Sequence, residues 1–82
     1  MSKKEKLLRK LSNANNTFAW TDLVTLLSQL GFEKVERAGS RIVFIHTETE
    51  HTIYLHKPHP ANYIKGGALK AVKSYLAHRG DL

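Results

Sequence analysis

Two histidines lie three residues apart in a short proline-containing segment, His56-Lys57-Pro58-His59-Pro60-Ala61-Asn62. Imidazole gains and loses a proton near neutral pH, so His56 and His59 are candidates for general acid–base catalysis. The flanking prolines restrict the backbone around His59 and favour a fixed position for its ring. Arg41 and Lys57 add positive charge, and the arginine fork matches phosphate oxygens. Together these residue types suit proton transfer at a phosphate ester without a metal.

Further candidates for phosphate binding lie on both sides of this segment. Gly39-Ser40 has the composition of a turn, and its backbone N–H groups and hydroxyl can join Arg41 on one phosphate. The alternative for Arg41 is a salt bridge with Glu48 or Glu50. Nearer the C-terminus, the first turn of a predicted helix also suits an anion, although its glycine–lysine spacing is not that of a P-loop. The candidates there, which are equally consistent with solvated side chains, are Asn62, Lys65, Lys70 and Lys73.

The other histidines are assigned to the surface. His46 precedes the acidic residues of a predicted hairpin loop and is expected to be solvated, as are His51 and His78. The His56-x-x-His59 spacing fits two metal ligands, but zinc sites usually need three or four protein ligands. The chain offers no clear third ligand and contains no cysteine. We therefore predict neither a metal site nor a cofactor.

Composition limits the class of protein further. The chain has 82 residues, enough for a single small core without a large enclosed cavity. Thirteen Lys and Arg against seven Asp and Glu give a net charge of +6, which favours nucleic acid or another polyanion as partner. No apolar run is long enough to span a membrane, and no signal peptide is evident. The absence of cysteine fits a reducing compartment, so a cytoplasmic protein is expected.

Hydrophobic periodicity predicts three helices and three strands. Apolar residues at helical spacing indicate helices over residues 3–11 and 20–30 and from residue 68 to near Gly80, and Gly31 suits the end of the second helix. Residues 57–67 are predicted to form a loop. Alternating or β-branched stretches indicate strands over residues 32–37, 41–46 and 52–56.

The connections between the strands are too short for crossovers, so the sheet should be antiparallel. We predict an α+β two-layer sandwich, with a three-stranded antiparallel sheet and helices on one face. Residues 1–16 are assigned to an N-terminal helical extension and residues 17–82 to the domain. The pattern does not determine which face of strand 41–46 points inward. The predicted core consists of Trp20, Leu23, Val24, Leu27, Phe44, Ile53, Leu55, Leu69, Val72 and Leu76.

The order of three short motifs resembles that of the HicA toxin family. These are Gly31-Phe32 at a helix end, Gly39-Ser40-x-x-x-Phe44 in the second strand, and His56-x-Pro58-His59 before the last helix. The resemblance covers residues 18–79 and implies a fold like that of the double-stranded-RNA-binding domain. It also implies a toxin of a type II toxin–antitoxin pair, which cleaves messenger RNA and is neutralised by a HicB-type antitoxin.

One position departs from the family pattern. Most members have a histidine taken to be catalytic directly after the Gly-Ser pair, and this chain has Arg41. The chain is more similar to a longer branch of the family with Gly-Ser-Arg and His-Lys-Pro-His-Pro motifs. We therefore expect a metal-independent endoribonuclease that uses His56, His59 and Arg41, with phosphate contacts from the Gly39-Ser40 pair and Lys57. The alternative is a non-catalytic RNA-binding module or a degenerate toxin.

Overall fold

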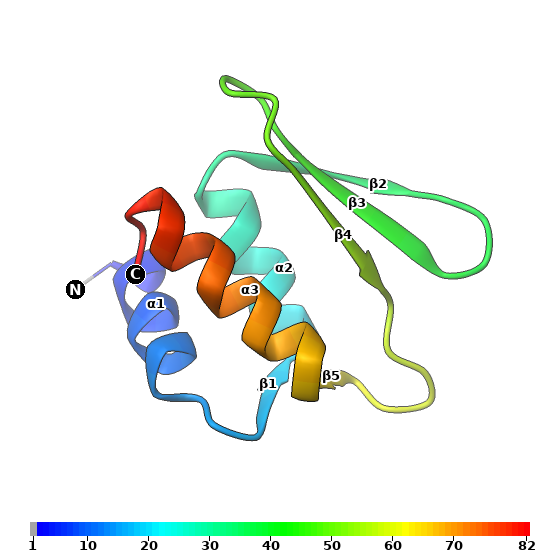
Figure 1. The fold of residues 1–82 in the computed structure, drawn as a ribbon, viewed down its shortest axis with the longest axis horizontal. Coiled ribbons are helices and arrows are strands. Elements are labelled where there is room, and N and C mark those ends of the chain that lie inside the picture. The colour runs from blue at the N-terminus through cyan, green and yellow to red at the C-terminus, as the bar shows by residue number, and fades with distance from the viewer. Residues whose placement is uncertain (1) are drawn as a thin grey trace.

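The computed structural model describes residues 2–82, which form three helices and five short strands, four of them consecutive between the second and third helices. It has the predicted α+β architecture, with α2 and α3 on one face of a three-stranded sheet (Figure 1). None of these helices is long and apolar enough to cross a membrane. The elements are α1 (Lys3–Asn13), β1 (Thr17–Ala19), α2 (Trp20–Gln29), β2 (Phe32–Glu36), β3 (Arg41–His46), β4 (Thr52–His56), β5 (Tyr63–Lys65) and α3 (Gly66–Arg79).

The central sheet is an antiparallel meander in the order β2-β3-β4, as the short connections predict. Its register pairs Phe44 with Ile53, and both side chains lie in the core. Because side chains alternate between the faces of a strand, Val43 and its partner Tyr54 point to the opposite face. The sheet therefore has one face under the helices and one open face.

Helices α2 and α3 supply most of the core beneath this sheet. Trp20 at the start of α2 packs edge-on against Phe44, with the ring centroids 6.2 Å apart. Burial of each large apolar side chain contributes about 1.5–3 kcal/mol, so this layer is the main source of stability. Of the predicted core, Val24 and Leu55 are only partly buried, and the buried members are Trp20, Leu23, Leu27, Phe44, Ile53, Leu69, Val72 and Leu76.

A second, two-stranded sheet was not predicted. Strand β1 pairs with β5 in antiparallel register, with Phe18 opposite Ile64, and both of these side chains are buried. The prediction of an uninterrupted loop over residues 57–67 is therefore wrong, because β5 and the first turn of α3 lie within that range. Three-residue strands are too short to show a period, and their pairing joins segments distant in sequence. This ribbon anchors the end of the histidine-containing segment to the start of α2.

Local backbone chemistry sets the helix ends. The Ser2 side chain accepts a hydrogen bond from the Glu5 backbone N–H at 3.2 Å and caps α1. Gly31, with φ +98°, follows α2, and Gly80, with φ +93°, caps α3 in the left-handed region. Helix α1 extends two residues beyond the predicted range, and its Leu11 belongs to the common core.

Candidate functional site

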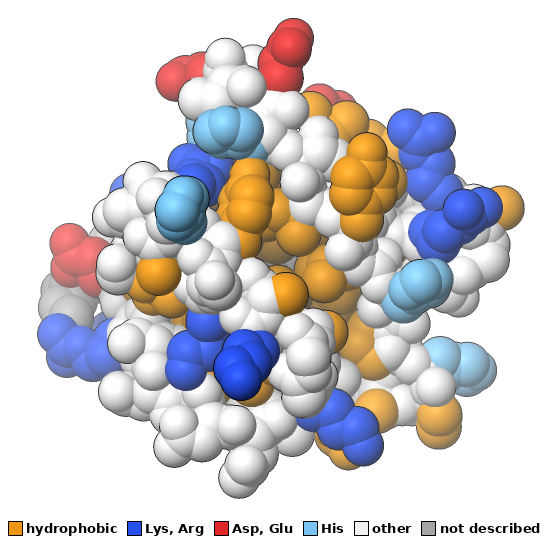
Figure 2. All heavy atoms as spheres, viewed as in Figure 1, with side chains coloured by type: hydrophobic (Ala, Val, Ile, Leu, Met, Phe, Trp, Pro, Cys, Tyr) orange, Lys and Arg blue, Asp and Glu red, His pale blue; other side chains and the backbone are white. Residues whose placement is uncertain are grey.

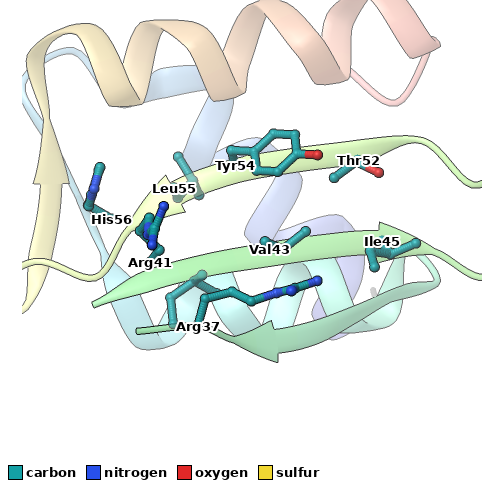
Figure 3. A pocket seen from close by; sticks show the side chains of 9 residues that line it. Arg37, Arg41, Val43, Ile45, Thr52, Tyr54, Leu55 and His56 are labelled. Carbon is teal, nitrogen blue, oxygen red and sulfur yellow. The ribbon is translucent and has the colours of Figure 1, made fainter. Parts of the chain in front are cut away.

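Arg41 and His56 meet at one end of the central sheet. Arg41 begins β3, His56 ends β4, and the two are Cα partners. The Lys57 N–H donates to the Ser40 carbonyl at 2.8 Å, directly beyond this pair. A hydrogen bond in that position makes Arg41–His56 a non-hydrogen-bonded pair, the kind in which side chains approach more closely. Figure 3 shows the guanidinium and the imidazole beside each other, and both residues are exposed.

The turn before β3 holds Arg41 in this place. Gly39 and Ser40 both have positive φ, at +72° and +62°. Glycine adopts this conformation freely, whereas a non-glycine residue in it is uncommon and costs about 1 kcal/mol or more. The Arg37 N–H closes the turn by donating to the Arg41 carbonyl at 2.7 Å. Two backbone hydrogen bonds thus surround the strained Ser40. One joins Arg37 to Arg41 across the turn, and the other joins Lys57 to Ser40 itself.

The Arg41 side chain is only partly committed within the protein. Its Nε donates to the Ala38 carbonyl at 3.1 Å, which orients the guanidinium. The ion pairs among residues 2–82 are Lys10–Asp22 and Arg79–Asp81, so the alternative salt bridge from Arg41 to Glu48 or Glu50 does not form. Oriented by one backbone contact, the guanidinium has terminal nitrogens that are chemically suited to donate hydrogen bonds to an anion.

His56 borders two separate hollows. The first, the open-face hollow, has a volume of about 450 Å³ and is lined by Arg37, Arg41, Ile42, Val43, Ile45, Thr52, Tyr54, Leu55 and His56. The second, the loop hollow, has a volume of about 370 Å³ and is lined by His56, Pro58, His59, Pro60, Ala61, Tyr63, Ile64, Lys65 and Ala68. The structure therefore brings His56 together with Arg41 on one side and with His59 on the other.

The predicted phosphate-binding residues divide into two groups. Lys65 lines the loop hollow together with His59, whereas Asn62 is held at the start of α2, where its carbonyl accepts a hydrogen bond from the Trp20 N–H at 2.9 Å. Lys70 and Lys73 instead line a third hollow, between the end of α1 and α3. The Lys73 ammonium donates to the Ala14 carbonyl at 2.8 Å and thereby ties α3 to the segment after α1. These two lysines do not share a hollow with Arg41 or His56.

His46 differs from its prediction as a solvated hairpin residue. Its side chain is buried, and its ring packs edge-on against Phe32. Nε2 lies 2.9 Å from the Leu30 carbonyl, which can only accept, so this nitrogen carries the hydrogen. Nδ1 then accepts from the backbone N–H groups of Glu48 and Thr49 at 3.2 and 3.3 Å. His46 joins the end of α2 to the hairpin loop and is structural, whereas His51 and His78 are exposed as expected.

Two residues of the open-face hollow, Arg37 and Tyr54, were given no functional role by sequence reasoning. Arg37 follows β2 and faces the hollow, and Tyr54 lies on β4 two residues before His56. The alternation of Thr52, Tyr54 and His56 was the available signal, since it places all three on one face. Figure 2 shows acidic side chains at the outer hairpin tip and basic ones around the opposite end of the sheet. In the part of the chain described, no three metal-ligating side chains gather at one point.

Comparison with protein families identifies a family that matches most of this chain. The family model described as the HicA toxin of bacterial toxin–antitoxin systems matches residues 20–77. This range covers α2, the central sheet, β5 and most of α3, and it includes the Arg41–His56 pair. No curated protein and no solved structure matches the chain.

Proposed function

The chain belongs to the HicA toxin family of bacterial toxin–antitoxin systems, and we propose that it is a metal-independent endoribonuclease. In this proposal it cleaves messenger RNA in the cytoplasm and is blocked by a HicB-type antitoxin. The observation that carries the proposal is the Arg41–His56 pair, fixed by the hydrogen bond from Lys57 to Ser40. This pair sets an imidazole next to a guanidinium on a strongly basic chain with a net charge of +6, which supports proton transfer at a bound phosphate.

The proposed reaction needs only groups that this chain supplies. One imidazole, from His56 or His59, takes the proton of a 2′-hydroxyl while that oxygen attacks the adjacent phosphorus. The bond from phosphorus to the 5′-oxygen breaks, the other imidazole gives that oxygen a proton, and a 2′,3′-cyclic phosphate forms. Arg41 stabilises the extra negative charge that develops on the phosphate oxygens. No oxidant or metal is required for the balance of this step.

The remaining basic and turn residues are proposed to hold the RNA backbone. Lys57 and the Gly39-Ser40 turn adjoin the Arg41–His56 pair and would contact the reacting phosphate. Lys65, which lines the loop hollow with His59, and Asn62, three residues after His59 in the chain, would contact the next phosphate. Lys70 lies in the hollow beside α1 and extends the positive surface away from the reacting centre, with Lys73 beside it. Phosphate contacts of this kind make binding decrease steeply as salt rises.

A second candidate function rests on Arg41 itself. The family resemblance implies a catalytic histidine at this position, and arginine cannot exchange a proton near neutral pH. A chain with this substitution would bind RNA without cleaving it. RNA fragments distinguish the two functions, because only the ribonuclease generates them.

Inducing the gene in bacteria, alone or together with the gene encoded beside it, tests the toxin function. A ribonuclease toxin is expected to arrest growth when induced alone, and the neighbouring gene is expected to restore growth. Loss of the arrest with His56→Ala would connect it to the proposed chemistry. Normal growth with the intact gene, at protein levels confirmed by immunoblot, would favour the non-cleaving module.

A further inference from the structure

Tyr54 is the most exposed large apolar side chain among the described residues. Its exposed fraction is 76%, against 37% for Tyr63 and for Leu82. It lies in the middle of β4, where the backbone is fixed by pairing to β3. A ring this exposed contributes little to the core, so its flat faces are free for a ligand.

The surroundings of Tyr54 are apolar below and positive at the sides. Its cross-strand partner Val43 and the nearby Ile45 form the floor of the open-face hollow. Figure 3 shows Arg37 and Tyr54 on opposite sides of Val43, with Arg41 and His56 at one end. None of the nine residues that line this hollow is acidic. The hollow therefore combines a flat aromatic face with two guanidinium groups.

A nucleotide with an unpaired base matches this combination. The base stacks on an aromatic ring, and the phosphates on either side of it attract arginine. Bases within a duplex are already stacked on one another and present only their edges, so they cannot use such a ring. We propose that the open face of the β2-β3-β4 sheet binds single-stranded RNA, with Tyr54 stacking on an unpaired base and Arg37 and Arg41 contacting its phosphates.

The position of Tyr54 relates this surface to the proposed chemistry. Tyr54 and His56 are two residues apart on one strand, so they share a face at a separation of about 6.6 Å along it. A base stacked on Tyr54 thus lies next to the phosphate held at the Arg41–His56 pair. The inference rests on the proposed ribonuclease function and deepens it, because it selects unpaired RNA and assigns Tyr54 to nucleotide positioning.

Binding to a 2′-O-methyl oligonucleotide of mixed sequence tests this proposal, since its blocked 2′-oxygen prevents cleavage. Fluorescence anisotropy would compare the single strand with its duplex for the full chain and its variants. Tyr54→Phe keeps the ring and is expected to bind within about twofold of the unchanged protein. Tyr54→Leu keeps apolar area but removes the flat face, and it should weaken single-strand binding about tenfold. Thermal unfolding of each variant should be unchanged because the side chain is exposed.

Arginine variants test the phosphate part of the same surface. Arg37→Ala is expected to weaken binding about tenfold and to reduce its dependence on salt. Arg9→Ala is the matched control, because Arg9 is an exposed arginine on α1, outside the open-face hollow. Equal losses from the two changes would indicate a general charge effect and would overturn the assignment of Arg37.

Three results would overturn the stacking surface. The first is full affinity of Tyr54→Leu for the single strand, and the second is equal affinity of the unchanged protein for duplex and single strand. The third is a Tyr54→Leu variant that binds RNA normally but is no longer neutralised by the antitoxin. The last would identify the open face as a protein interface. Failure of the intact chain to cleave unmodified RNA would instead refute the ribonuclease function. The stacking proposal would still be supported in that case by selective weakening in Tyr54→Leu.

Discussion

Arg41 and His56 are neighbours because the backbones of β3 and β4 pair, and not because both line a deep pocket. The Gly39-Ser40 turn, in which both residues have positive φ, places Arg41 at the start of β3. The hydrogen bond from the Lys57 N–H to the Ser40 carbonyl aligns His56 opposite Arg41. Both side chains are exposed, so the proposed binding of a phosphate requires no opening of the protein. In the proposed mechanism, the backbone pairing of these two exposed residues provides the positioning that an enclosed pocket provides in a larger protein.

Replacing Arg41 with alanine is expected to reduce kcat/KM for RNA cleavage by about 10- to 100-fold, the usual value of a hydrogen bond to a charged group. Arg41→Lys should recover part of this loss, because it keeps the charge without the fork. Cleavage of a fluorogenic RNA provides the measurement, with Arg9→Ala as the charge control. Full activity in Arg41→Ala would exclude the proposed role, and activity that appears only in Arg41→His would identify a degenerate toxin.

The sequence could name candidate residues for chemistry but not their packing. His56, His59 and Arg41 were recognisable from residue type and the family resemblance, and their catalytic roles stay predictions. His46 was misassigned because the acidic residues after it suggested a solvated hairpin loop, although Phe44, on the same face of β3, was predicted to lie in the core. His46 lies two residues later, on the same face, and is buried with it. Arg37 escaped notice because only the folded sheet places it at the same hollow as Tyr54.

At the scale of elements, the junction between α2 and β2 depends on the Gly31-Phe32 pair. Gly31 has φ +98°, and a Cβ atom built there would lie 2.8 Å from Nε2 of His46. That imidazole holds the Leu30 carbonyl and the hairpin loop at once. The glycine of this motif is thus required both by backbone conformation and by the close approach of a buried side chain.

Gly31→Ala is expected to lower the free energy of unfolding by about 2–4 kcal/mol, since it adds backbone strain and displaces a hydrogen-bonded ring. Urea denaturation gives the measurement. Gly67→Ala is a matched control, because its Cβ would meet nothing within 4 Å and no positive φ is required. The control should be neutral or slightly stabilising. Equal stability of the two variants would contradict the role given to Gly31.

Element prediction succeeded where the period was long enough to read. Helix α2 carries a clear 3.6-residue pattern, β4 a clear 2-residue alternation, and β3 a continuous β-branched and aromatic run. The bounds of all three agree with the structure to within one residue. Strands β1 and β5 were missed because each has only three residues, and neither pairs with a sequence neighbour. Their pairing depends on burial of Phe18 and Ile64, which becomes evident only in three dimensions.

At the scale of the whole molecule, side chains of α1 are buried in the same hydrophobic core as those of the other helices and the sheet. Leu7 and Leu11 belong to the same buried cluster as Phe44, and Lys10 forms an ion pair with Asp22 of α2 at 2.7 Å. The exposed ion pair contributes at most about 1 kcal/mol, so the leucines dominate this interface. The division into an extension over residues 1–16 and a domain over residues 17–82 stays a prediction, and this packing indicates that the first segment stabilises the second.

Leu11→Ala is therefore expected to destabilise the entire chain by about 2–5 kcal/mol in a single unfolding transition. Leu11 is completely buried, whereas Leu8 on the same helix is only partly buried and serves as the comparison. Thermal unfolding followed at α-helical and tryptophan signals would detect the shift. Unchanged unfolding of Leu11→Ala would mean that α1 is dispensable for the rest of the fold.

The central claim is that this chain cleaves RNA by metal-independent proton transfer through His56 and His59. Its most direct test is incubation of the purified full chain with RNA in excess EDTA, beside His56→Ala, His59→Ala and the exposed-histidine control His78→Ala. The account predicts fragments ending in 2′,3′-cyclic phosphate from the unchanged chain and from His78→Ala. It also predicts a loss of about a hundredfold or more in each of the other two variants. Undiminished cleavage in both His56→Ala and His59→Ala, or cleavage abolished by EDTA alone, would contradict it.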